Sequence, residues 1–174
     1  MNELEPMLTR WANFYVSMAQ AGAALIGLLF VVITIATDRR SNDIAKIRVY
    51  LTPTVIYFAT VLGISELLTI PSHTRLTAAL CICLVGVVGF AYSGSLFVRR
   101  GGRMSYYEKH DLIPHAVLPF ASFGLLVLGG ASLLHGPEHG IAFVAAGILS
   151  LLLIGIRNSW AIVVDVVSTR PGGP

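Results

Sequence analysis

A line of small and polar residues recurs at steps of three and four in the first apolar stretch of the chain. This polar stripe consists of Asn13, Ser17, Gln20, Ala24, Gly27, Val31, Thr34 and Asp38. At 3.6 residues per turn, these positions share a helix face, while bulkier residues such as Leu25 and Phe30 occupy others. A membrane helix with such a stripe is expected to turn it toward protein or water rather than toward hydrocarbon.

The sequence leaves two interpretations of the polar stripe open. In the first, neighbouring helices pack closely on it, with Ala24 and Gly27 allowing the approach and Gln20 donating a hydrogen bond across. In the second, several copies of the chain place this helix around a pore, with polar rings at both ends and a narrow apolar middle that gates by dewetting. The pore-lining residues would then be Asn13, Ser17, Gln20, Thr34 and Asp38.

Glu66 is the one acidic residue well inside an apolar segment. A carboxylate at the bilayer centre costs about 2.5–3.5 kcal/mol on insertion scales, so Glu66 is a candidate ion- or proton-binding group. We expect its helix face to point into protein, at a depth that allows a hydrogen bond with Gln20. That face also carries Gly63, Ala59, Ile56 and Thr52. The alternative is a solvated carboxylate at the outer interface, or one paired with Arg75 or a loop histidine.

A second group of candidate ligands lies in the short links. It consists of His73, His135, Glu138 and His139. Imidazole and carboxylate side chains bind zinc and similar ions, and His135 and His139 are four residues apart. Gly136 and Pro137 intervene, however, so the sequence does not predict one regular helix carrying both rings. The alternative is that all four are ordinary loop side chains, and we predict no cofactor.

The elements that would position these residues are membrane-spanning helices. Apolar residues make up 55% of the chain and charged residues 12%, roughly half the share in soluble domains, so lipid is the expected outer solvent. Spanning the hydrocarbon core takes about 20 apolar residues. We predict an all-α integral membrane bundle, a single domain over 1–174, with a cytoplasmic tail at 161–174. Its five expected spans are 11–37, 49–70, 76–98, 112–134 and 140–160.

The distribution of Lys and Arg predicts the orientation of this bundle. With five spans, ten basic residues fall on one side of the membrane and only two, Arg10 and Arg75, on the other. Cytoplasmic loops are enriched in Lys and Arg, so the N-terminus is expected outside and the C-terminus in the cytoplasm. The ten are Arg39, Arg40, Lys46, Arg48, Arg99, Arg100, Arg103, Lys109, Arg157 and Arg170.

Small residues inside the other apolar segments predict close helix packing. They are Gly86, Gly89, Ser93, Ser122, Gly129, Ser132, Gly147 and Ser150. Helices in lipid associate through van der Waals contact, which small side chains permit by letting two backbones approach. We therefore expect a compact bundle.

The run Trp11-Ala-Asn-Phe14-Tyr15, followed by the small and apolar stretch from Ala21 to Val31, resembles the first helix of many small uncharacterised bacterial membrane proteins. The resemblance covers the first apolar segment alone. It implies a multi-pass protein of the bacterial inner membrane. It implies no activity and no site residues.

These features predict a small homo-oligomeric channel or transport protein for ions or small solutes, with the first span nearest the axis. In that case Gln20→Leu or Glu66→Ala should reduce ion flux. The alternative is a non-catalytic accessory or regulatory subunit that binds another membrane protein. We do not expect an enzyme, because the sequence shows no catalytic constellation. Nor do we expect a nucleic-acid partner, because the basic residues flank the apolar segments.

Overall fold

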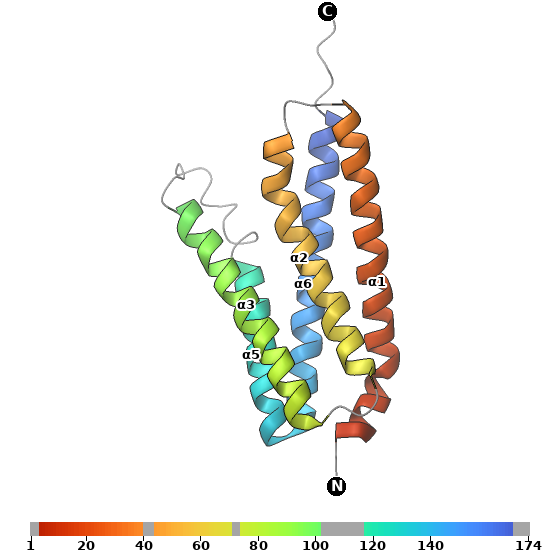
Figure 1. The fold of residues 1–174 in the computed structure, drawn as a ribbon, viewed down its shortest axis with the longest axis vertical. Coiled ribbons are helices and arrows are strands. Elements are labelled where there is room, and N and C mark those ends of the chain that lie inside the picture. Colours follow the sequence, from red (N-terminus) through yellow and green to blue (C-terminus); the bar gives the residue numbers. More distant parts are fainter. Residues whose placement is uncertain (1–3, 40–43, 71–73, 102–116, 169–174) are drawn as a thin grey trace, which may run out of the picture.

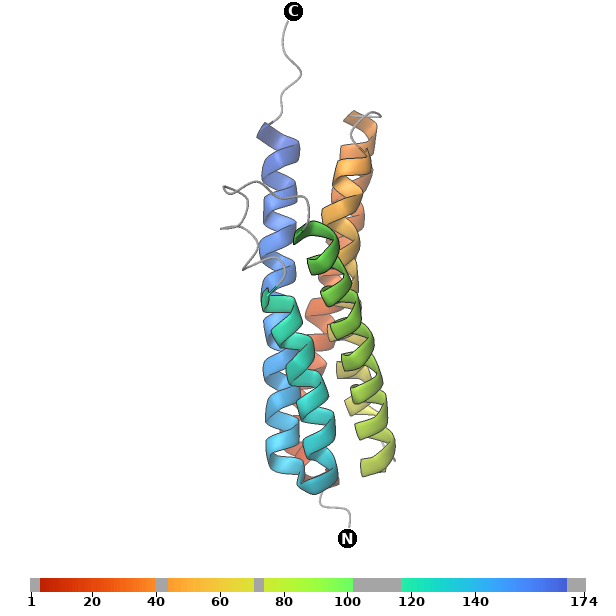
Figure 2. The ribbon, with the colours of Figure 1, turned by 90° about the vertical axis from the view of Figure 1, so that its left-hand side faces the viewer.

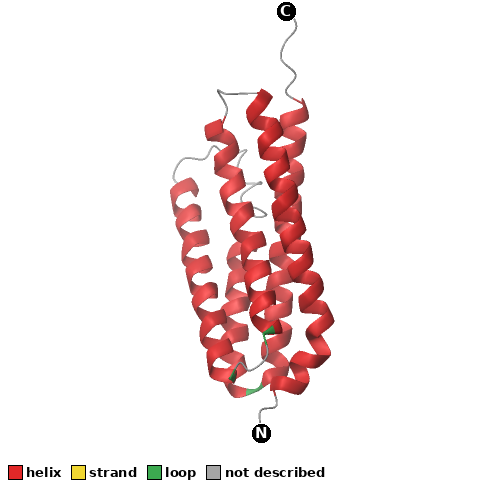
Figure 3. Ribbon diagram, turned by 45° about the vertical axis from the view of Figure 1, so that its right-hand side comes forward, coloured by secondary structure: helices red, strands yellow, loops and turns green. Residues whose placement is uncertain are grey.

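In a computed structural model of the chain, residues 4–39, 44–70, 74–101 and 117–168 can be described. Over these ranges the fold is all-α, as the composition predicts, and every helix is long and apolar enough to cross a membrane. The described ranges hold five such helices (Figures 1 and 3): α1 (Leu4–Arg39), α2 (Ile44–Thr69), α3 (Arg75–Gly101), α5 (Leu118–His135) and α6 (Pro137–Ser168).

Most of the helices continue beyond the apolar segments that predict them. The apolar part of α1 is Pro6–Thr34, but the helix already includes Leu4, whose side chain is fully buried. Only Gly136 separates α5 from α6. Pro137 is the first residue of α6, a position that suits proline because its fixed φ matches the start of a helix. α5 begins at Leu118 with a proline in its first turn; residues 112–116 of the expected fourth span lie outside the described residues.

The helices alternate in direction, so α1 begins and α6 ends at opposite ends of the bundle (Figure 1). α6 is the central helix, packing against α5, α2 and α1. α1 pairs with α2 on one side of the bundle, and α3 pairs with α5 on the other (Figure 1). In Figure 2, α3 and α5 lie in front, with α5 beside α6. α2 and α3 touch only lightly. Among the described helices, α6 buries the largest share of its apolar segment and α1 the smallest.

Glycine brings the paired backbones together, which confirms the close packing expected from the small residues. A Cβ on Gly86 of α3 would lie 2.9 Å from the backbone nitrogen of Val127 in α5. A Cβ on Gly129 of α5 would lie 3.0 Å from the backbone nitrogen of Val144 in α6. Neither position has room for a side chain, because the neighbour is backbone and cannot move aside.

Candidate functional site

The polar stripe faces away from the other described helices. Its members from Asn13 to Thr34 are all exposed, whereas Tyr15, Ala19 and Leu29 on the opposite face of α1 are buried. Gly27 shows how open this side is, because an added Cβ there would meet nothing within 4 Å. The side chain of Asp38, the last member of the stripe, lies outside the described part of the structure.

The face of α1 that packs against the bundle is therefore not the polar stripe. The interpretation that neighbouring helices approach at Ala24 and Gly27 does not hold within one chain. A Cβ on Gly22 would lie 3.2 Å from the carbonyl oxygen of Phe58 and 3.3 Å from the nitrogen of Leu62, so α1 approaches the α2 backbone there. Gln20 is two residues away, about 200° around the helix from Gly22. Within one chain, neighbouring helices thus pack opposite the stripe and not on it.

The hydroxyl groups of the stripe bond to their own helix. Ser17 Oγ donates to the carbonyl oxygen of Asn13 at 2.8 Å, and Thr34 Oγ1 donates to that of Phe30 at 2.9 Å. Such bonds to the preceding turn satisfy a hydroxyl without any partner helix. The Gln20 amide forms no hydrogen bond with the residues that the structure describes. In lipid, the Gln20 amide would therefore need a partner beyond the described residues.

Glu66 is exposed one turn before the end of α2, and its helix face points outward. The expectation that this face points into protein is wrong for the single chain, because Thr52, Ala59 and Gly63 beside it are exposed too. Thr69 Oγ1 donates to the Glu66 backbone carbonyl at 2.8 Å and lies 3.5 Å from its Oε2. Glu66 and Gln20 form no hydrogen bond with each other, although the sequence suggested that their depths would allow one.

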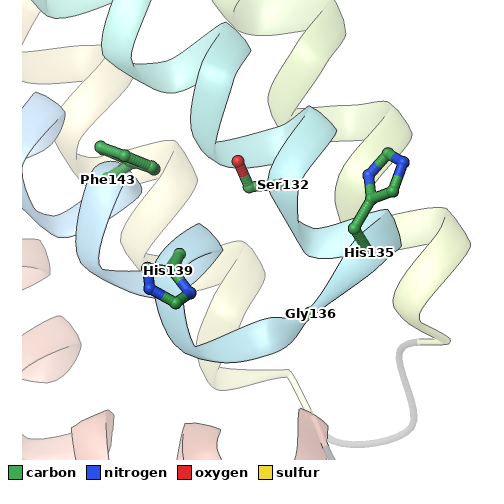
Figure 4. Close-up of a pocket in the computed structure, with 5 residues that line it drawn as sticks. All are labelled: Ser132, His135, Gly136, His139 and Phe143. Atoms are coloured by element: carbon green, nitrogen blue, oxygen red, sulfur yellow. The ribbon is translucent and has the colours of Figure 1, made fainter.

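Two of the predicted metal ligands lie at the α5–α6 turn, beside a cavity of about 460 Å³. Its lining includes Ser132, His135, His139 and Phe143. Figure 4 shows the two imidazoles on different sides of the turn, each pointing away from the other. Nδ1 of His135 lies 3.3 Å from the carbonyl oxygen of Ala131 in its own helix.

The described residues contain no group of three or more His, Cys, Asp or Glu placed to hold a metal ion. Glu138 is exposed in the first turn of α6, where it does not join the two imidazoles in a ligand set. His73, the fourth residue of the predicted metal site, lies outside the described residues.

A groove between α2 and α3 was not predicted from the sequence. This α2–α3 groove has a volume of about 410 Å³. It is lined by Ile56, Ala59, Thr60, Gly63, Ile64 and Leu67 of α2, and by Cys81 and Val85 of α3. The small residues Ala59 and Gly63, one turn apart on α2, are the only local signal for it. The groove itself exists because α3 packs on α5 and only lightly on α2.

The described residues thus present an outward polar stripe on α1, an exposed carboxylate near the end of α2 and an apolar groove beside it. The stripe and the groove lie on different sides of α2, because α1 flanks that helix on one side and α3 on the other (Figure 1). Comparisons of the chain with protein-family models, with curated proteins and with solved structures found no match.

Proposed function

We propose that the chain is a small homo-oligomeric membrane channel or transport protein for ions or small solutes, with α1 nearest the axis of the oligomer. The observation that carries this proposal is the outward direction of the polar stripe. A single chain in lipid would hold these groups against hydrocarbon. Copies arranged with α1 inward would instead turn them toward each other and toward water.

Gln20 makes the strongest demand for such an arrangement. It lies at the midpoint of the apolar segment Pro6–Thr34, so its amide would sit near the middle of the bilayer. Removing an amide from water without a replacement hydrogen bond costs roughly 2–7 kcal/mol, depending on the reference state. A ring of Gln20 side chains around an axis would satisfy these amides through one another or through water in a pore.

The order of residues along the stripe suits a gated pore. Asn13 and Ser17 lie toward one end and Thr34 toward the other, while Ala24, Gly27 and Val31 lie between them. A short constriction of small apolar groups between polar ends can open and close by wetting and dewetting. The permeant species would accordingly be an ion or a small solute.

The orientation that we propose places the N-terminus outside and the C-terminus in the cytoplasm of a bacterial inner membrane. Its support is the ten-to-two distribution of Lys and Arg, together with helices that alternate in direction. In this orientation Arg39 and Arg157 lie toward the cytoplasmic face, and Arg10 and Arg75 toward the outer face.

The direct test measures ion flux into liposomes that contain the purified protein, alongside its oligomeric state in nanodiscs. We expect a symmetric oligomer and a flux that Gln20→Leu reduces, because leucine keeps the bulk but removes the amide. Ser159→Ala serves as the control, because among the described residues the Ser159 hydroxyl bonds to the carbonyl of Gly155 in its own helix and to no other group. Equal flux from wild type, Gln20→Leu and empty liposomes would overturn the channel.

A second function fits the same stripe, because exposed small residues also suit docking onto a different membrane helix. In that case Ala24 and Gly27 would allow close approach of another membrane protein, and the chain would be an accessory subunit without flux of its own. The oligomeric state separates the two functions. A stable monomer without flux favours the accessory subunit, whereas a closed ring with flux favours the channel.

A further inference from the structure

The α2–α3 groove runs along α2 for about the depth of one lipid leaflet. Its lining extends from Ile56 to Leu67, eleven residues apart, which corresponds to about 16 Å at about 1.5 Å per residue. The hydrocarbon core of a bilayer is about 30 Å thick, so one leaflet accounts for about half of that. Leu67 lies near the end of the apolar segment Leu51–Thr69, and Ile56 lies four residues beyond its midpoint, Thr60. The groove therefore extends from near one membrane surface to slightly past the bilayer midplane.

The groove is too small to hold a whole helix along its length. A 16 Å length of helix would fill roughly 1,300–1,800 Å³ at the usual helix diameter, several times the groove volume of about 410 Å³. A helix with its side chains is about 10–12 Å across. Ala59 and Gly63 leave this space because they are small, and a Cβ added at Gly63 would meet nothing within 4 Å. The space fits a slender chain.

The lining of the groove offers almost no free hydrogen-bonding capacity. Thr60 carries the one hydroxyl in it, and Thr60 Oγ1 already donates to the carbonyl oxygen of Ile56 at 2.8 Å. The remaining side chains are apolar apart from the thiol of Cys81. A polar solute would lose its hydrogen bonds to water there and gain none in return. The occupant that this chemistry favours is a hydrocarbon chain.

A negative charge lies beside the surface end of the groove. Glu66 is not one of the lining residues, but it lies one turn beyond Gly63 on the same outward side of α2. It is three residues, or about 4.5 Å, from the end of the apolar segment, at the level where headgroups begin. The Glu66 carboxylate is exposed, so it can accept hydrogen bonds from a cation at this level.

We propose that the α2–α3 groove binds an amine-headed phospholipid, with one acyl chain along Gly63 and the ammonium group paired with the Glu66 carboxylate. This site is independent of the proposed channel, because it lies on the α3 side of α2 and the polar stripe belongs to α1. It also gives Glu66 a role in lipid binding that does not require contact with Gln20.

The test uses the full chain in vesicles of phosphatidylethanolamine and phosphatidylglycerol. A trace of either lipid carries a photoreactive diazirine in its acyl chain, and adducts are located by mass spectrometry after irradiation. We expect adducts of the ethanolamine probe to concentrate on α2 residues 56–67 and at Cys81 and Val85. The exposed outer face of α3 provides the comparison within each sample, because Leu80 and Leu84 meet ordinary bulk lipid.

Two variants separate the acyl chain from the headgroup. Gly63→Leu fills the groove and should remove its adducts from both probes. Gly27→Leu, at an equally open glycine in α1, should leave the groove adducts unchanged. Glu66→Gln should lower groove adducts of the ethanolamine probe by about two- to fivefold, the effect of one exposed ion pair, and leave those of the glycerol probe unchanged.

Three outcomes would overturn the proposal. Adducts spread evenly over the groove and over Leu80 and Leu84 would mean that the groove holds only bulk lipid. If Glu66→Gln lowered the groove adducts of both probes equally, Glu66 would not recognise the amine of the headgroup. Chain-to-chain links formed by a thiol-specific cross-linker at Cys81, in a Cys83→Ala background and without lipid adducts, would show that a second copy covers the groove.

Discussion

The hydroxyl group of Tyr15 in α1 donates a hydrogen bond of 3.3 Å to the backbone carbonyl of Ile141, the fifth residue of α6. The two residues are 126 positions apart in the sequence. Tyr15 is fully buried. The Trp11 ring packs against it in a tilted arrangement at a centroid distance of 6.4 Å, and the Phe14 ring packs edge-on at 5.3 Å. This contact anchors one face of α1 on the central helix. The polar stripe, on the opposite face, consequently points outward.

Tyr15→Phe should destabilise the bundle slightly, because it removes the hydroxyl and keeps the buried ring. Interhelical hydrogen bonds in membrane proteins contribute about 0.6 kcal/mol on average. Tyr15→Ala should cost about 3–5 kcal/mol by analogy with other buried aromatic residues, because it also leaves a cavity. Reversible unfolding in mixed micelles, followed by circular dichroism, measures both. Equal stability of wild type and Tyr15→Ala would contradict the anchoring role of this residue.

Gly27→Leu should abolish flux, whereas Gly63→Leu should leave it unchanged. Both glycines face open space, so neither leucine disturbs the folded chain. Gly27 belongs to the polar stripe, and four more carbons in the narrow middle of a pore should reduce flux to the level of empty liposomes. Gly63 lies in the α2–α3 groove, away from the stripe, so Gly63→Leu should conduct like wild type. If Gly63→Leu lost flux and Gly27→Leu kept it, the permeation pathway would lie along α2 and not along α1, which would contradict the proposal.

Gly155→Ala should destabilise the contact between α6 and α2. A Cβ at Gly155 would overlap the ring of Phe58, which is fully buried, so the ring would have to shift within the core. Overpacking of a core costs about 1–3 kcal/mol. Gly27→Ala is the matched control, because its Cβ meets nothing and alanine favours the helix by about 0.5–1 kcal/mol. The same unfolding assay should rank Gly27→Ala above wild type and Gly155→Ala below it, and the reverse order would refute this packing.

Reporter fusions should place the two ends of the chain on opposite sides of the membrane. We expect a C-terminal green fluorescent protein to fluoresce, as it does in the cytoplasm, and an N-terminal epitope tag to be accessible to antibody in spheroplasts. The physical reason is the excess of basic residues on one side of the bundle. The control exchanges the reporters. A reporter active only in the cytoplasm is fused to the N-terminus and one active only in the periplasm to the C-terminus, and we expect neither to be active. Both ends in one compartment would contradict an odd number of spans.

Much of the fold follows from the sequence, because hydropathy and helical periodicity are local properties of the chain. Segments such as Leu51–Thr69 and Glu138–Ala161 are long and apolar enough to cross a membrane, which length and composition alone reveal. The polar stripe could also be found by counting, since steps of three and four return to the same helix face. Small residues such as Gly86 and Gly129 indicated where backbones approach, and the structure confirms both positions.

The tertiary structure decided where each of these faces points. Nothing local makes the stripe face outward; contacts of Tyr15 with Ile141 and of Gly22 with the α2 backbone set the rotation of α1. In the same way, the outward side of α2 exposes Glu66 and separates it from Gln20, and the light contact between α2 and α3 opens the groove. Periodicity defines a face only relative to its own helix axis. The rotation about that axis depends on partners far along the chain, because packing against them is what distinguishes one rotation from another.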